Sequence, residues 1–108
     1  MLETQRIFSA FTDTYKHLTN KIKNYRDLYH SQSCGFCLDI KKYLVRRDIL
    51  SIYETLLTYE KALRNRFKNE QIDGDYISAH FIQRKLLEIE IQLGYVEDEL
   101  IIYGIKLL

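Results

Sequence analysis

Residues 79–107, AHFIQRKLLEIEIQLGYVEDELIIYGIKL, decide the expected fold, because their apolar residues recur at alternating spacings of three and four. This is the spacing of the a and d positions of a heptad repeat, which form one stripe along an α-helix. We therefore expect a helix over residues 75–107, with Asp75 as its N-cap after a turn at Asp73 and Gly74. The stripe consists of Ala79, Ile82, Leu86, Ile89, Leu93, Val96, Leu100, Tyr103 and Leu107.

The same spacing occurs twice earlier in the chain. One stripe runs from Phe8 to Tyr29 and predicts a helix over residues 2–29, and another runs from Leu38 to Leu63 and predicts a helix over residues 37–69. Short connections make consecutive helices antiparallel neighbours. The sequence thus predicts an all-α fold, a single domain over residues 1–108 that forms an elongated antiparallel three-helix bundle with coiled-coil-like seams. The second helix has the widest apolar surface and is expected in the middle.

The composition agrees with a helical protein. The 108 residues include no proline and only four glycines, which argues against collagen-like, proline-rich and loop-dense β proteins. No long apolar run and no basic segment followed by an apolar one is present, so we expect a cytoplasmic protein without a membrane partner. One alternative stays open at the C-terminus, where residues 100–108, LIIYGIKLL, could form a strand instead of a helix.

The third predicted helix also has apolar residues on the side opposite its stripe, among them Ile77, Leu87 and Ile101. Apolar side chains that face water in a bundle mark an interaction surface. We therefore predict a non-enzymatic interaction module without a cofactor, such as a small adaptor, an inhibitor or a chaperone-like protein, that binds a protein partner or forms a homodimer. The alternative interpretation is that the third helix lies between the other two, which then cover both of its apolar sides. The predicted binding residues are Phe81, Ile91, Gly94, Tyr95, Ile102 and Ile105.

A cluster of basic residues at the tip of the first helical hairpin suggests a second function, that of a nucleic-acid-associated regulator. It is not favoured, because Glu97, Asp98 and Glu99 are expected level with Arg46 and Arg47 and can pair with them. The cluster consists of Lys21, Lys23, Arg26, Lys41, Lys42, Arg46 and Arg47.

The only motif with distinctive chemistry is Cys34-Gly35-Phe36-Cys37, which His30 precedes. The two thiols and the imidazole are zinc ligands, but a structural zinc site needs four, so a zinc-bridged dimer would have to share them. A thiol redox protein is the other alternative, although the βαβ context of thioredoxin-like proteins is missing. Both are less favoured than two reduced cysteines at the end of a bundle. No catalytic signature is present, and we predict no metal and no enzyme.

Overall fold

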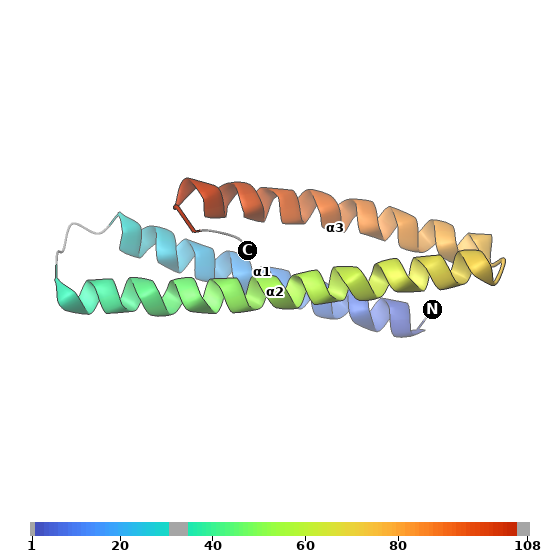
Figure 1. Cartoon of the computed structure of the whole chain (residues 1–108), viewed down its shortest axis with the longest axis horizontal. Coiled ribbons are helices and arrows are strands. Elements are labelled where there is room, and N and C mark those ends of the chain that lie inside the picture. Colours follow the sequence, from blue (N-terminus) through green and yellow to red (C-terminus); the bar gives the residue numbers. More distant parts are fainter. Residues whose placement is uncertain (1, 31–34, 106–108) are drawn as a thin grey trace.

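The computed structural model describes residues 2–30 and 35–105 and consists of three long helices. They are α1 (Leu2–Tyr29), α2 (Phe36–Ile72) and α3 (Tyr76–Ile102). Each runs back along the previous one, and together they form a rod of 59 × 21 × 20 Å (Figure 1). The predicted elongated antiparallel three-helix bundle is confirmed, and no strand occurs in the described residues.

The core follows the predicted stripe most closely on α3, whereas several stripe residues of α1 and α2 are only half-buried. On α3, all seven stripe positions from Ala79 to Leu100 are buried. Apart from Ile105, the other two helices supply the remaining large core side chains, and together they form one continuous apolar interior along the rod. From α1 and α2 these are Phe11, Leu18, Ile22, Tyr25, Ile49, Tyr53, Leu56 and Leu63.

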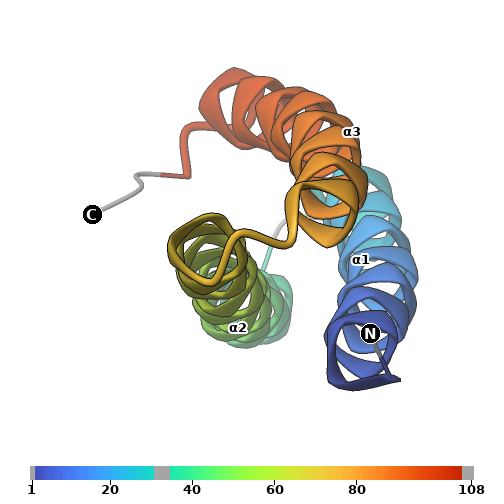
Figure 2. The same cartoon turned by 90° about the vertical axis from the view of Figure 1, so that its right-hand side faces the viewer.

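The middle position of α2 is also confirmed. Figure 2 shows the three helices from one end of the rod. The α2 helix packs along both other helices, whereas α1 and α3 contact each other little. Neighbouring side chains of α2 contact different helices. Ile52 lies near His17 and Lys21 of α1. Tyr53 donates a hydrogen bond to Glu97 of α3. The wide apolar surface of α2 therefore holds the bundle together, and α1 and α3 are separated by a shallow groove.

The connection between α2 and α3 is shorter than the sequence predicts. We expected α2 to end at residue 69, but it continues to Ile72. It ends where Gly74 adopts a left-handed φ of 80°, and the Asp75 and Gly74 N–H groups donate to the carbonyls of Glu70 and Gln71 at 3.0 and 3.2 Å. This is a Schellman motif, which terminates a helix by satisfying its last carbonyls.

The end of α3 requires a similar correction. The helix stops at Ile102 rather than at residue 107, because Gly104 has a left-handed φ of 70°. The Ile105 N–H then donates to the Leu100 carbonyl at 2.8 Å, and the Ile105 side chain turns back into the core, where it is 2% exposed. A buried apolar residue in this position commonly accompanies a Schellman motif. Residues 106–108 lie outside the described residues.

Asp75 is expected to make the bundle sensitive to acid. Hydrogen bonds from the Ser78 hydroxyl and then the Ser78 N–H hold the pKa of the Asp75 carboxyl below its usual value. A carboxyl with a depressed folded-state pKa stabilises the fold above its unfolded pKa, and this contribution is lost as the pH falls through the folded-state pKa, below about pH 4. Asparagine caps equally well without titrating.

Urea unfolding at about pH 7 and about pH 3 tests this expectation. Asp75→Asn should lose less stability on acidification than the wild-type chain. Asp73→Asn, in the same turn, serves as the control and should keep the wild-type pH dependence. Equal acid sensitivity of the wild-type chain and Asp75→Asn would refute a role for this carboxylate.

Candidate functional site

The side of α3 that points away from the core carries exposed apolar residues among charged ones. We call it the outer face. Leu87 is 55% exposed, Ile91 60% and Tyr95 66%, while the seven buried residues of α3 lie on the opposite side of the same helix. An isolated exposed apolar residue is ordinary, but a row along one helix face is not. The apolar residues of the outer face are Ile77, Leu87, Ile91, Tyr95, Ile101 and Ile102.

Two of the predicted binding residues do not belong to this face. Phe81 is half-buried against the core, and the Lys85 ammonium lies 5.6 Å from the centre of its ring. Ile105 is buried, since the chain reverses at Gly104 before reaching it. Both predictions assumed a straight helix with every back position facing water. In the structure, the Lys85 ammonium contacts the rings of both Phe81 and Phe8 of α1, which places Phe81 on the flank of α3 that faces α1. Ile105 follows the end of the helix.

Gly94 lies on the outer face, as predicted. A Cβ placed on it would meet no atom within 4 Å, so nothing within the described chain requires a glycine there. Glycine inside a helix costs about 1 kcal/mol relative to alanine. A small residue on an exposed helix face allows close approach of another element, which is consistent with a binding surface.

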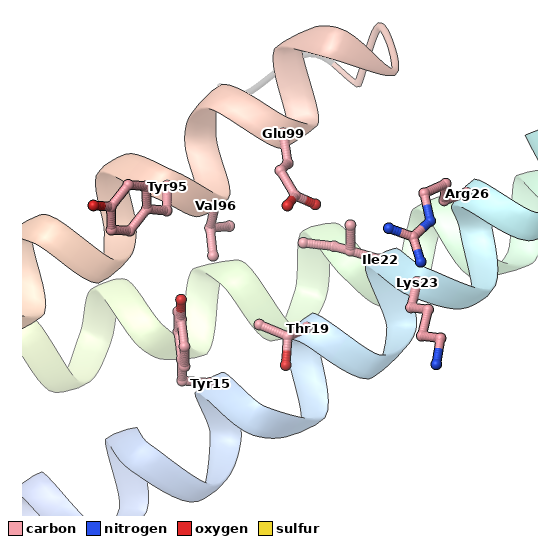
Figure 3. Close-up of a pocket in the computed structure, with 8 residues that line it drawn as sticks. All are labelled: Tyr15, Thr19, Ile22, Lys23, Arg26, Tyr95, Val96 and Glu99. Atoms are coloured by element: carbon pink, nitrogen blue, oxygen red, sulfur yellow. The ribbon is translucent and has the colours of Figure 1, made fainter.

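A shallow groove of about 170 Å³ lies beside the outer face, between α1 and α3 (Figure 3). Tyr95 and Glu99 of α3 border it on one side, and Tyr15, Lys23 and Arg26 of α1 on the other. Burial, and secondarily the negative charge of Glu99, raises the pKa of the Tyr15 hydroxyl. The groove continues the outer face through Tyr95 and adds charges of both signs at its edge.

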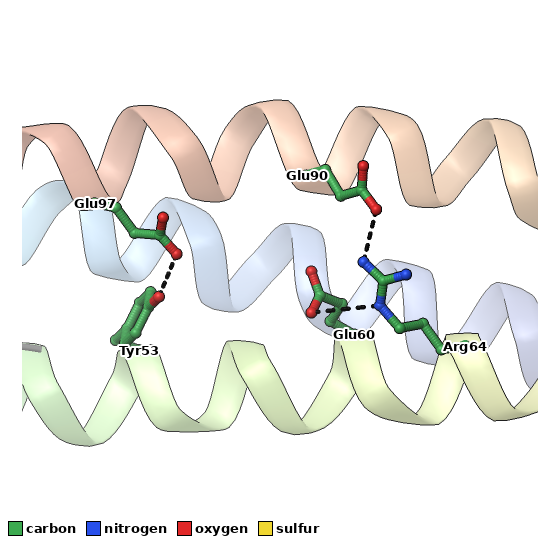
Figure 4. Close-up of polar contacts among 5 residues, drawn as sticks. All are labelled: Tyr53, Glu60, Arg64, Glu90 and Glu97. Atoms are coloured by element: carbon green, nitrogen blue, oxygen red, sulfur yellow. Dashed lines mark hydrogen bonds and ion pairs between the residues drawn. The ribbon is translucent and has the colours of Figure 1, made fainter. Parts of the chain in front are cut away.

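Polar contacts also join α2 to α3 (Figure 4). The Tyr53 hydroxyl donates to Glu97, and burial together with this hydrogen bond raises the pKa of Tyr53. Farther along, Arg64 donates to Glu90 at 2.6 Å and lies 3.6 Å from Glu60. These contacts fix the register between the two helices.

That register corrects the predicted pairing of the acidic and basic residues. The turn lies at Asp73 and Gly74 as predicted, but α2 continues to Ile72, so the two helices pair farther along α2 than expected and Glu97 lies opposite Tyr53 rather than opposite Arg46. Among the described residues, no ion pair joins Glu97, Asp98 or Glu99 to Arg46 or Arg47.

Several residues of the predicted basic cluster make other contacts within the chain. Arg46 donates to the Tyr25 hydroxyl at 2.7 Å, Lys42 lies 5.8 Å from the ring centre of Tyr29, and Lys21 lies 3.6 Å from Asp48. The others are exposed, and two of them border the groove instead of the hairpin tip. These exposed residues are Lys23, Arg26, Lys41 and Arg47.

The same end of the bundle carries an exposed apolar cluster that the sequence analysis did not single out. It consists of Tyr29, Ile40, Tyr43 and Leu44, which are 42–61% exposed. In the sequence, these residues flank positions 31–34, which lie outside the described residues. Ile40, Tyr43 and Leu44 lie outside the α2 stripe, and this is the signal that could have identified them. Tyr29 ends the predicted α1 stripe and was expected in the core, but it is 48% exposed.

The cysteine motif is only partly described. Cys37 is exposed on the first turn of α2, and the His30 ring packs edge-on against Tyr29 and Tyr103. Within residues 2–30 and 35–105, no three His, Cys, Asp or Glu side chains gather closely enough to hold a metal ion. Cys34 lies outside the described residues, so the zinc and thiol hypotheses stay untested.

Comparison with known proteins finds no relative: no protein-family model, no curated protein and no solved structure matches the chain. In the described part of the chain, no helix has the length and hydropathy needed to cross a membrane. The site must therefore be interpreted from its own chemistry.

Proposed function

We propose that this chain is a non-enzymatic protein-binding module and that the outer face of α3 is its binding surface. The observation that carries the proposal is the uncovered apolar row, in which Leu87, Ile91 and Tyr95 are each more than half exposed. The partner is an amphipathic helix, because a straight apolar row along one helix is recognised by a second helix packed lengthwise against it.

The free energy available from this surface is sufficient for a stable complex. Burial of about 500 Å² of apolar surface at about 25 cal/mol per Å² contributes on the order of 12 kcal/mol. Association costs at least about 4 kcal/mol in lost translational and rotational freedom. The remainder, at most about 8 kcal/mol, corresponds to a dissociation constant of about 1 µM.

Photo-crosslinking tests the proposal in cells that produce the chain. Benzoylphenylalanine at position 91 should give a discrete protein adduct, because a helix packed on the outer face would lie within reach of this side chain. The same group at position 61, an exposed lysine of α2, is the control. Adding Leu87→Glu should abolish the adduct at position 91, since it places a charge in the apolar contact.

Circular dichroism of each purified variant checks that the helices are retained. The proposal fails if position 91 yields no adduct, or if it yields the same adducts as position 61. It also fails if Leu87→Glu leaves the adduct unchanged while the fold is intact.

A further inference from the structure

The outer face contains a second heptad seam, which we call the outer seam. Its members follow one another at spacings of three and four over nearly the whole of α3, as in the seam that faces the core. The apolar members are Ile77, Leu87, Ile91 and Ile101. The others are His80, Arg84, Gly94 and Asp98.

We infer that the occupant of the outer seam is α3 of a second copy of this chain, packed antiparallel. This inference rests on the proposed function, since it identifies the helix that the outer face binds. In this dimer, the two-fold axis passes level with Ile89, which is thirteen residues from either end of α3 (Tyr76–Ile102). The two helices then overlap over their full length, and the contact is self-complementary, as a two-fold interface requires.

The apolar members of the outer seam match under this symmetry. Ile77 of one copy lies opposite Ile101 of the other, at both ends of the contact. Leu87 lies opposite Ile91 on either side of the axis. All four are at least 55% exposed in the single chain, so each gains burial from the pairing.

The polar members and Gly94 match as well. His80 lies opposite Asp98 of the second copy, and Arg84 lies opposite Gly94 of the second copy. The missing side chain of Gly94 leaves room for the Arg84 stem, and the guanidinium can then reach Asp98, one turn away. No ion pair within the described residues engages His80, Arg84 or Asp98.

The same charges disfavour a parallel pair. In a parallel arrangement, Arg84 would face Arg84 of the other copy and Asp98 would face Asp98, and like charges across a seam are repulsive. The antiparallel arrangement replaces both repulsions with attraction between unlike charges. It also aligns the two helix dipoles favourably.

Charge reversal tests the register by sedimentation equilibrium. Arg84→Asp and Asp98→Arg should each weaken dimerisation about tenfold or more, and the double variant should return to within about threefold of the wild-type dissociation constant. Restoration requires an intermolecular contact, since the two residues are almost four turns apart on one helix. Lys61→Asp is the control for an exposed charge reversal and should leave dimerisation unchanged.

Cysteine pairing tests the direction of the helices. In a Cys34→Ser/Cys37→Ser background, mixing Ile77→Cys with Ile101→Cys should give a disulfide-linked heterodimer, because these positions face each other across the antiparallel seam. Each variant alone should give little covalent dimer. Predominant homodimers through position 77 would demonstrate a parallel pair and overturn the inference.

A wild-type chain that stays monomeric at roughly 100 µM also overturns the inference. The photo-adduct at position 91 then separates the two claims. An adduct with a different protein retains the proposed function and excludes the dimer, whereas the absence of an adduct refutes both.

Discussion

Leu56→Ala is expected to lower the free energy of unfolding by about 3 kcal/mol. Leu56 is fully buried on α2, the helix that packs against both others, so the truncated side chain leaves a cavity that neither neighbouring helix can fill alone. This cost is the sum of the lost transfer free energy of the removed atoms and the free energy of leaving a cavity. Urea unfolding followed by circular dichroism measures it, and the slope should stay unchanged.

Leu87→Ala is the matched control, because it makes the same chemical change on the outer face. Leu87 is 55% exposed, and its truncation should cost less than about 0.5 kcal/mol at dilute concentration. At high concentration, the cost should rise if the outer face is covered, since a bound partner stabilises the folded state by mass action. Equal costs for the two variants at dilute concentration would contradict the assignment of core and outer face.

The core could be predicted from sequence because burial in a long helix follows a simple period. All seven described stripe positions of α3 are buried as expected. The ends of the helices could not be predicted as well, since they depend on which glycine adopts a left-handed φ. Gly74 and Gly104 do, at 80° and 70°, and they determine where α2 and α3 stop.

A three-residue error at the end of α2 then affected the predicted surface contacts. It shifted the expected level of Glu97 along α2, so the prediction paired it with arginines instead of Tyr53. The outer face itself was visible as apolar residues opposite a seam. Phe81 was misplaced because only the packing of three helices determines which flank of α3 turns toward α1.

At the hairpin tip, too, the sequence pattern predicts burial but not individual contacts. There, a buried tyrosine contacts Arg46, one of the predicted nucleic-acid-binding residues. Tyr25 is 1% exposed and packs edge-on against Tyr103 at 5.9 Å between ring centres. Arg46 lies 5.6 Å from the centre of the Tyr25 ring and donates to its hydroxyl at 2.7 Å. Periodicity placed Tyr25 in the core but gave no indication of this contact.

Tyr25→Ala is therefore expected to cost about 4 kcal/mol, because it removes a buried aromatic ring together with its contacts to Arg46 and Tyr103. Tyr25→Phe keeps the ring and the cation–π contact and removes only the hydroxyl that accepts from Arg46, so it should cost about 1 kcal/mol. Tyr43→Ala, at a position that is 61% exposed near the same end, is the control and should cost less than about 0.5 kcal/mol.

Urea unfolding measures these costs, and a double-mutant cycle between Tyr25→Phe and Arg46→Gln separates two roles for Arg46. If Arg46 stabilises the hairpin tip through Tyr25, Arg46→Gln should destabilise the wild-type chain more than the Tyr25→Phe chain, because the hydroxyl and the guanidinium then act as one unit. If the free-energy costs of Arg46→Gln and Tyr25→Phe are additive, Arg46 does not stabilise the tip through the Tyr25 hydroxyl and belongs to the exposed basic surface instead. A cost for Tyr25→Ala no greater than that for Tyr43→Ala would refute the packing of the tip itself.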